Sequence, residues 1–197
     1  MVIPRAARLF LAAMLFLSLG KGAGSAFALE VDDGFGPARE AQGKHFTVYY
    51  PPEVEAFSLL RELRISASDQ VLAGGTLSRG DSAGAELADM VDILFNRVCN
   101  ILDMQLYSYK GNIKVCASQS QLNVIYTNLF EKELTRKSFY INDLNTIYIS
   151  AESFTREILG HEMAHAIICH YFVVAPSVKV QEILASYVEY QLRKFNE

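Results

Sequence analysis

The chain has 197 residues, 51% of them hydrophobic, and a formal net charge of −4 at pH 7. This length and composition indicate one compact globular domain. The acidic balance and the absence of a basic run make a nucleic acid a poor partner. Three cysteines, Cys99, Cys116 and Cys169, are too few for a disulfide scaffold. We expect them to be buried hydrophobes, with one disulfide as the alternative.

The first 28 residues have the pattern of a secretory signal peptide. Arg5 and Arg8 precede an apolar stretch over 9–19, and Ala26-Phe27-Ala28 is a small-x-small cleavage site. A membrane span needs about 20 apolar residues, and this stretch is shorter. An uncleaved anchor helix is the alternative. We therefore expect an exported protein, periplasmic or secreted, with no stable membrane span after cleavage. A flexible segment over 29–43 then precedes a single domain over 44–197.

Hydrophobic periodicity and turn residues predict a mixture of strands and helices. Ser118 and Ser153 are the expected amino-terminal caps of two helices. The order suggests an α+β fold, a small twisted mixed sheet with helices packed on one side and two antiparallel helices at the carboxyl end. The expected elements are strands over 45–50, 113–116, 138–141 and 146–150, and helices over 53–63, 85–104, 119–131, 153–172 and 178–195.

The segment His161-Glu162-Met163-Ala164-His165 is the main chemical signal. Histidines one helical turn apart project together and can reach one metal ion. Zinc favours nitrogen ligands with one carboxylate and one position left for water, and Glu162 is placed to take a proton from that water. The surrounding helix is apolar nearly all round, so unsatisfied imidazoles there are costly. A metal-free core helix, whose histidines hydrogen-bond to neighbours, is the alternative.

A third ligand is expected from the last helix. The motif helix ends near residue 172, the chain turns over 173–177, and a returning antiparallel helix brings Glu182 level with the histidines. Cys169, one turn beyond His165, is the competing ligand. His170 points about 180° away from His161 in a continuous helix, so we expect it to face solvent or cap the helix.

This pattern resembles the gluzincin metallopeptidases, and more closely the small peptidase-MA-like domains, over residues 146–190. A strand like that from Phe46 to Pro51 often opens such domains. The resemblance implies a zincin-like fold and one zinc ion held by His161, His165 and Glu182, with Glu162 as the general base. The matching residues are His161, Glu162, His165, Pro176, Val180, Glu182, Ala185 and Tyr187.

The resemblance also implies roles around the metal. Thr146, Ile147, Tyr148 and Ile149 would form the edge strand that pairs with an extended substrate. Glu189 would be a second carboxylate behind the ligands, because the usual position holds Ser186; a solvated charge is the alternative. Ile183 follows the ligand glutamate, where the family has Gly or Ala. Candidates for stabilising the transition state, by chemistry only, are Tyr148, Tyr171, Tyr187 and Tyr190.

We therefore expect an exported zinc metalloendopeptidase that acts on a peptide or protein substrate. The alternative is a catalytically silent zinc-containing binding or scaffold protein of the same fold, favoured by Ile183 and by the short carboxyl end. A metal-free structural domain is the third interpretation. Larger gluzincins carry a further domain that walls the cleft, so a protein partner is a candidate for completing it here.

Overall fold

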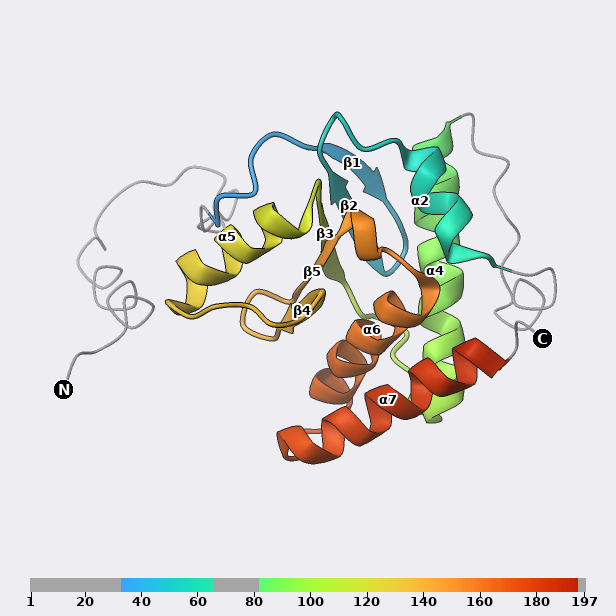
Figure 1. Cartoon of the computed structure of the whole chain (residues 1–197). Helices are drawn as coiled ribbons and strands as arrows, with labels where there is room; N and C mark the ends of the chain where they lie inside the picture. Colours follow the sequence, from blue (N-terminus) through green and yellow to red (C-terminus); the bar gives the residue numbers. More distant parts are fainter. Residues whose placement is uncertain (1–32, 66–81, 195–197) are drawn as a thin grey trace, which may run out of the picture.

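The computed structural model describes residues 33–65 and 82–194 (Figure 1). The predicted signal peptide over 1–28 lies outside these residues. Within the described ranges, no helix combines the length and the apolar character needed to cross a membrane. Cys99, Cys116 and Cys169 are free cysteines. Cys99 and Cys116 are buried, as predicted, whereas Cys169 is only partly buried.

The described residues form an α+β fold with a five-stranded mixed sheet. Helix α4 (Ala83–Leu102) takes its cap from Ser82, and α5 (Gln119–Phe130) takes its cap from Ser118 as predicted. In chain order the elements are β1 (Arg39–Gln42), β2 (Phe46–Tyr50), α2 (Ala56–Leu63), α4 (Ala83–Leu102), β3 (Gly111–Cys116), α5 (Gln119–Phe130), β4 (Ser138–Ile141), β5 (Thr146–Ser150), the 3₁₀ helix η2 (Ala151–Ser153), α6 (Arg156–Tyr171) and α7 (Val178–Lys194).

The strand order is β1-β2-β3-β5-β4. Strands β2, β3 and β5 run parallel, while β1 and β4 are antiparallel edge strands. The prediction that Thr146, Ile147, Tyr148 and Ile149 form the edge is therefore wrong. All five residues of β5 are buried, as is typical of a strand with neighbours on both sides. β5 pairs with β4 on one side and with β3 on the other, so β4 lies at the edge of the sheet.

The amino-terminal segment is more ordered than its sequence indicates. Residues 39–42 fall within the segment predicted to be flexible, yet they form β1 and pair with β2. Only Ala41 of this strand is buried, so the hydrophobic pattern is too weak to reveal it. Backbone pairing with β2 supplies the order that side-chain patterning does not.

Helices cover both faces of the sheet, so the prediction of helices on one side is wrong. Val48, Ile113 and Ile147 belong to the larger core, which α4 and α6 complete. Tyr148 and Phe139 belong to a smaller core with Leu122 and Ile125 of α5. Successive side chains of a strand point to opposite faces of the sheet, so neighbouring residues of β5 belong to different cores.

Helix α6 begins later than predicted. Ser153 ends η2, and Thr155 is the cap, its side chain accepting a 3.3 Å hydrogen bond from the Ile158 backbone N–H. Both Ser and Thr suit a cap position. Ser153 belongs to η2, so the next suitable residue, Thr155, caps α6. Helix α7 then runs back along α6 (Figure 1), in the antiparallel arrangement that the sequence predicts.

Candidate metal centre

Helix α6 places His161 and His165 on its face toward α7. Leu159, Met163 and Ala166 are fully buried on other faces of the same helix, so its rotation is set by core packing. The two imidazole centroids lie 5.1 Å apart. The helix therefore presents both rings together, as the spacing of the motif predicts.

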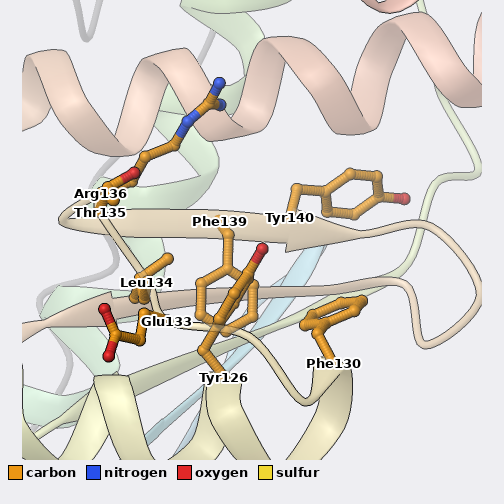
Figure 2. Close-up of a pocket in the computed structure, with 8 residues that line it drawn as sticks. All are labelled: Tyr126, Phe130, Glu133, Leu134, Thr135, Arg136, Phe139 and Tyr140. Atoms are coloured by element: carbon orange, nitrogen blue, oxygen red, sulfur yellow. The ribbon is translucent and has the colours of Figure 1, made fainter.

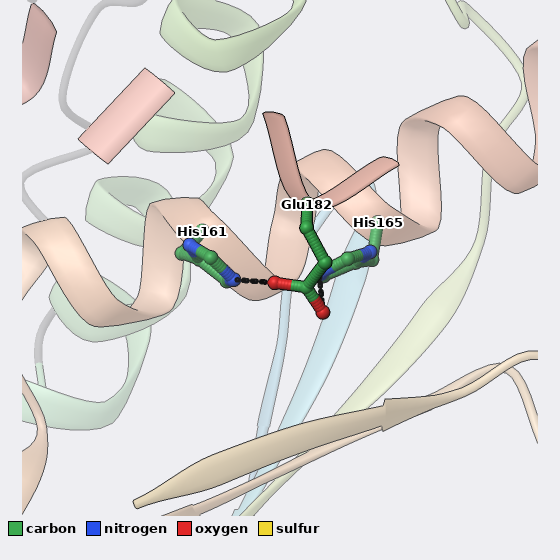
Figure 3. Close-up of side chains that lie close together, drawn as sticks. All are labelled: His161, His165 and Glu182. Carbon is green, nitrogen blue, oxygen red and sulfur yellow. Dashed lines mark ion pairs between the residues drawn. The ribbon is translucent and has the colours of Figure 1, made fainter. Parts of the chain in front are cut away.

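Glu182 of α7 reaches both rings (Figure 3). Its Oε2 lies 3.6 Å from His161 Nε2, and its Oε1 lies 3.8 Å from His165 Nε2. One ligand atom from each of the three residues fits within 4.8 Å of the others. Tetrahedral zinc, with bonds of about 2.0–2.2 Å, separates ligand atoms by about 3.4 Å. The donor set therefore fits a zinc ion, and binding would draw the ligand atoms closer together, from within 4.8 Å of one another to about 3.4 Å.

A hydrogen bond orients His165 from behind. Gln181 Oε1 lies 3.3 Å from His165 Nδ1. The Gln181 amide donates from Nε2 to the Pro176 carbonyl over 2.9 Å, which turns its oxygen toward the ring. An acceptor at Nδ1 favours the tautomer with its proton there and leaves Nε2 free as a metal ligand. Sequence analysis missed Gln181, although it directly precedes Glu182.

Glu189 faces the other imidazole. Its Oε2 lies 3.6 Å from His161 Nδ1, a buried nitrogen with no hydrogen-bond partner among the residues that the structure describes. Arg193 donates to Glu189 Oε1 over 2.6 Å. A metal-binding histidine usually donates its second N–H to a carboxylate, so a ring held at Nε2 would direct its Nδ1–H toward Glu189. The structure thus brings Glu189 to the place proposed for the second carboxylate.

The surroundings of both histidines favour the neutral form, which a metal ion requires. Burial lowers the pKa of His161, and this effect outweighs the opposing charges of Glu182 and Glu189. Burial and the neighbouring His161 lower the pKa of His165. Neutral imidazoles keep a lone pair available, because protonated rings cannot coordinate a metal.

Glu182 is ionised in this environment. Partial burial acts to raise its pKa, but the Arg136 guanidinium donates to Oε1 over 2.8 Å and holds the pKa below its usual value. Arg136 itself is 60% exposed. The ion pair therefore keeps the carboxylate charged and turned toward the histidines while solvent still reaches the rim.

Glu162 lies on the side of α6 that faces β4. It is only 5% exposed, and its Oε1 accepts a 2.7 Å hydrogen bond from the Ser138 hydroxyl. A backbone hydrogen bond from Tyr140 also reaches this carboxyl group. Burial raises the pKa of Glu162 to about 7 despite these contacts. A carboxyl group with such a pKa can both take and return a proton near neutral pH.

The remaining candidates lie elsewhere. Cys169 Sγ lies 3.6 Å from Gln181 Oε1, and the cluster that fits a metal among the described residues does not include it. His170 is exposed, with Nδ1 3.0 Å from the Ala166 carbonyl. Tyr148 lies in the smaller core, on the α5 face of the sheet, where its hydroxyl donates a hydrogen bond to Asp33. The other tyrosine candidates, all exposed, are Tyr171, Tyr187 and Tyr190.

Two further polar residues were not singled out in the sequence. Ser138 opens a short strand and Arg136 lies in the loop before it, so neither has a local pattern that points to the candidate metal centre.

Comparisons with protein-family models, curated proteins and solved structures found no match. Inference about function therefore depends on the geometry of these residues.

Proposed function

We propose that this protein is an exported zinc-dependent metalloendopeptidase with a zincin-like fold of the gluzincin type. The observation that supports it most is the convergence of His161, His165 and Glu182, whose ligand atoms lie within 4.8 Å of one another. Glu162, the next residue after the first histidine, lies buried beside β4. A purely structural zinc site would have no need of this additional acid.

Zinc, when bound, acts as a Lewis acid that polarises the substrate carbonyl and lowers the pKa of water. Glu162 takes the proton of the attacking water and later returns it to the leaving amine. Ser138 and the Tyr140 backbone orient the carboxyl group for both transfers. Burial supports this role, because it raises the pKa of Glu162 to about 7. A carboxyl group with this pKa can act as a base in one step and as an acid in the next near neutral pH.

The substrate is a peptide or protein segment in extended conformation. Its position is the outer edge of β4, in place of the 146–150 strand expected from the sequence, because β4 is the edge strand next to Glu162. An added strand would pair by β-augmentation with outward backbone groups of β4 other than the Tyr140 N–H, whose hydrogen bond Glu162 already accepts. This pairing would hold the peptide bond between the strand and α6.

A catalytically silent zinc-containing scaffold is the second candidate. The outward face of α7 carries exposed apolar side chains at helical spacing, which suits a protein partner that completes the cleft. The Arg136–Glu182 ion pair also occupies one oxygen of the third ligand. The exposed residues of this face are Val180, Ile183, Tyr187 and Tyr190.

The test compares wild type with Glu162→Gln and His165→Ala, measuring zinc per chain and cleavage of casein. We expect Glu162→Gln to retain zinc and to lose about 10²–10⁴-fold in cleavage rate. His165→Ala should lose both zinc and cleavage. Glu152→Gln, a change in the neighbouring η2 turn, is the matched control and should behave as wild type. Stoichiometric zinc without cleavage in the wild type would favour the scaffold, and no stoichiometric zinc would refute both proposals.

A further inference from the structure

A hollow lies beside the edge strand, outside the metal cluster. Its volume is about 280 Å³, and the residues used below are among its lining: Tyr126 and Phe130 of α5, Arg136, and Phe139 and Tyr140 of β4 (Figure 2). Whole small-molecule ligands occupy sites of about 300–1,000 Å³. The hollow falls just below this range and has room for one bulky side chain of a larger ligand.

Aromatic rings form one wall of the hollow. The Tyr126 centroid lies 4.7 Å from that of Phe130 and 5.0 Å from that of Phe139. Phe130 and Phe139 meet edge to face at 6.2 Å. Phe130 remains 41% exposed, so apolar ring surface is still available to a ligand. Another aromatic ring could add to this cluster in the offset or edge-on arrangements that such rings favour.

The hollow and the metal centre meet across β4. Figure 2 shows the three rings on one side of this strand, with Arg136 and Tyr140 on the other. Arg136 pairs with Glu182 over 2.8 Å, and Tyr140 contributes a backbone hydrogen bond to Glu162. A ligand that follows the strand would therefore touch both places.

We propose that the hollow is a substrate subsite for an aromatic side chain of an extended peptide paired with the outer edge of β4. This inference rests on the proposed function. Side chains directly opposite one another on paired strands point to the same face of a sheet. The peptide residue opposite Phe139 consequently points to the α5 face and enters the hollow. Its two neighbours point to the α6 face, toward Glu162 and the histidines, so the subsite reads the residue next to the reacting position.

Binding is measured on the zinc-loaded Glu162→Gln protein, so that bound peptide is not consumed. The probes are fluorescein-labelled Gly/Ala decapeptides, each with one Phe at a successive position, and an all-Gly/Ala peptide for comparison. Fluorescence anisotropy should give about 10-fold to 100-fold tighter binding for one Phe register, because a large apolar side chain leaves water. Equal affinity for all peptides would overturn the proposal.

Variants place the preference in the hollow. Added to Glu162→Gln, Phe130→Ala should reduce the Phe preference. Thr135 also lines the hollow, so Thr135→Trp should abolish the preference by filling the space. Val124→Ala is the matched control, because Val124 is 56% exposed on the same helix and does not line the hollow. Thermal unfolding checks that each variant is folded. A preference that survives both Phe130→Ala and Thr135→Trp contradicts the assignment.

Cleavage by the wild type separates this inference from the proposed function. Casein cleavage without any Phe preference in the binding assay would refute the subsite and leave the peptidase. The opposite result is also informative. If the wild type does not cleave casein, but the binding assay shows a Phe preference that Thr135→Trp abolishes, the peptidase is refuted and the subsite remains as a peptide-binding pocket.

Discussion

The two imidazoles of the candidate metal centre differ in the group that faces their Nδ1 atoms. His165 has the Gln181 amide at 3.3 Å from Nδ1, whereas His161 has the Glu189 carboxylate at 3.6 Å. An amide oxygen and a carboxylate can both accept a hydrogen bond from Nδ1–H, but only the carboxylate would add negative charge near a bound metal ion. Orientation of His165 therefore depends on a neutral residue whose side chain is itself fixed by the Pro176 carbonyl.

Replacing Gln181 should weaken zinc binding without touching a ligand. In Gln181→Leu the acceptor at His165 Nδ1 is lost, so the ring can rotate or change tautomer. We expect zinc affinity to fall about 10–100-fold, the usual effect of removing such a partner. Competition with a fluorescent chelator measures the change. Lys179→Ala, an exposed position on the same helix, is the control, and equal affinities in both variants would show that the amide does not orient the ring.

At the scale of elements, the candidate metal centre depends on how closely α6 and α7 approach. Gly160, directly before His161, makes this approach close: a Cβ there would lie 2.3 Å from Leu192 Cδ1. Val188 and Val98 lie 3.7 Å from the same point. A glycine inside a helix costs stability relative to alanine, and here it leaves room for α7 to bring Glu182 and Glu189 to the histidines.

Gly160→Val should therefore separate the two helices. Overpacking of this kind costs about 1–3 kcal/mol, and we expect both the free energy of unfolding and zinc affinity to decrease. Urea unfolding and chelator competition measure the two effects. The double variant Gly160→Val with Leu192→Ala should lose less stability than the sum of the single changes, because Leu192 is the clashing partner. Simple additivity would mean that the introduced valine side chain is accommodated elsewhere.

For the whole molecule, one buried network joins distant parts of the chain. Asp33 accepts hydrogen bonds from Lys114 of β3 over 2.6 Å and from the Tyr148 hydroxyl of β5 over 2.5 Å. Burial acts to raise the pKa of Asp33, but the bonds and charge from Lys114 and the bond from Tyr148 hold it below its usual value. The segment before β1 is thus tied to the centre of the sheet.

This network makes stability depend on acid pH. A carboxyl pKa that is lower in the folded than in the unfolded chain stabilises the fold above about pH 4, and the contribution is lost as pH falls through the folded value. Asp33→Ala should lower the free energy of unfolding at pH 7 by about 1–3 kcal/mol, because Tyr148 loses its acceptor. Urea unfolding followed by circular dichroism at several pH values measures both.

The variant should also lose less stability than wild type when the pH falls from about 5 to about 3. Asp143→Ala, which removes an exposed carboxylate from the β4–β5 turn, is the matched control and should keep the wild-type pH dependence. If Asp33→Ala and wild type lose the same stability over this pH range, the network does not couple Asp33 ionisation to folding.

Much of the architecture followed from local patterns. Apolar spacing located α2, α4, α5, α6 and α7 to within a few residues, because helix periodicity is a short-range property. The α6 spacing alone aligned His161 with His165, since residues four apart share a helix face. Strand β1 and the order of β4 and β5 escaped prediction, because strand pairing depends on partners far away in the chain.

The sequence by itself determined the helices and the side-by-side histidines, through periodicities that a few neighbouring residues define. Only the tertiary structure decided which strand forms the edge, where Tyr148 points, and that Arg136, Ser138 and Gln181 surround the candidate metal centre. These contacts join residues that the chain separates widely, such as Arg136 and Glu182. Their formation depends on how buried surfaces pack together, which no local sequence pattern specifies.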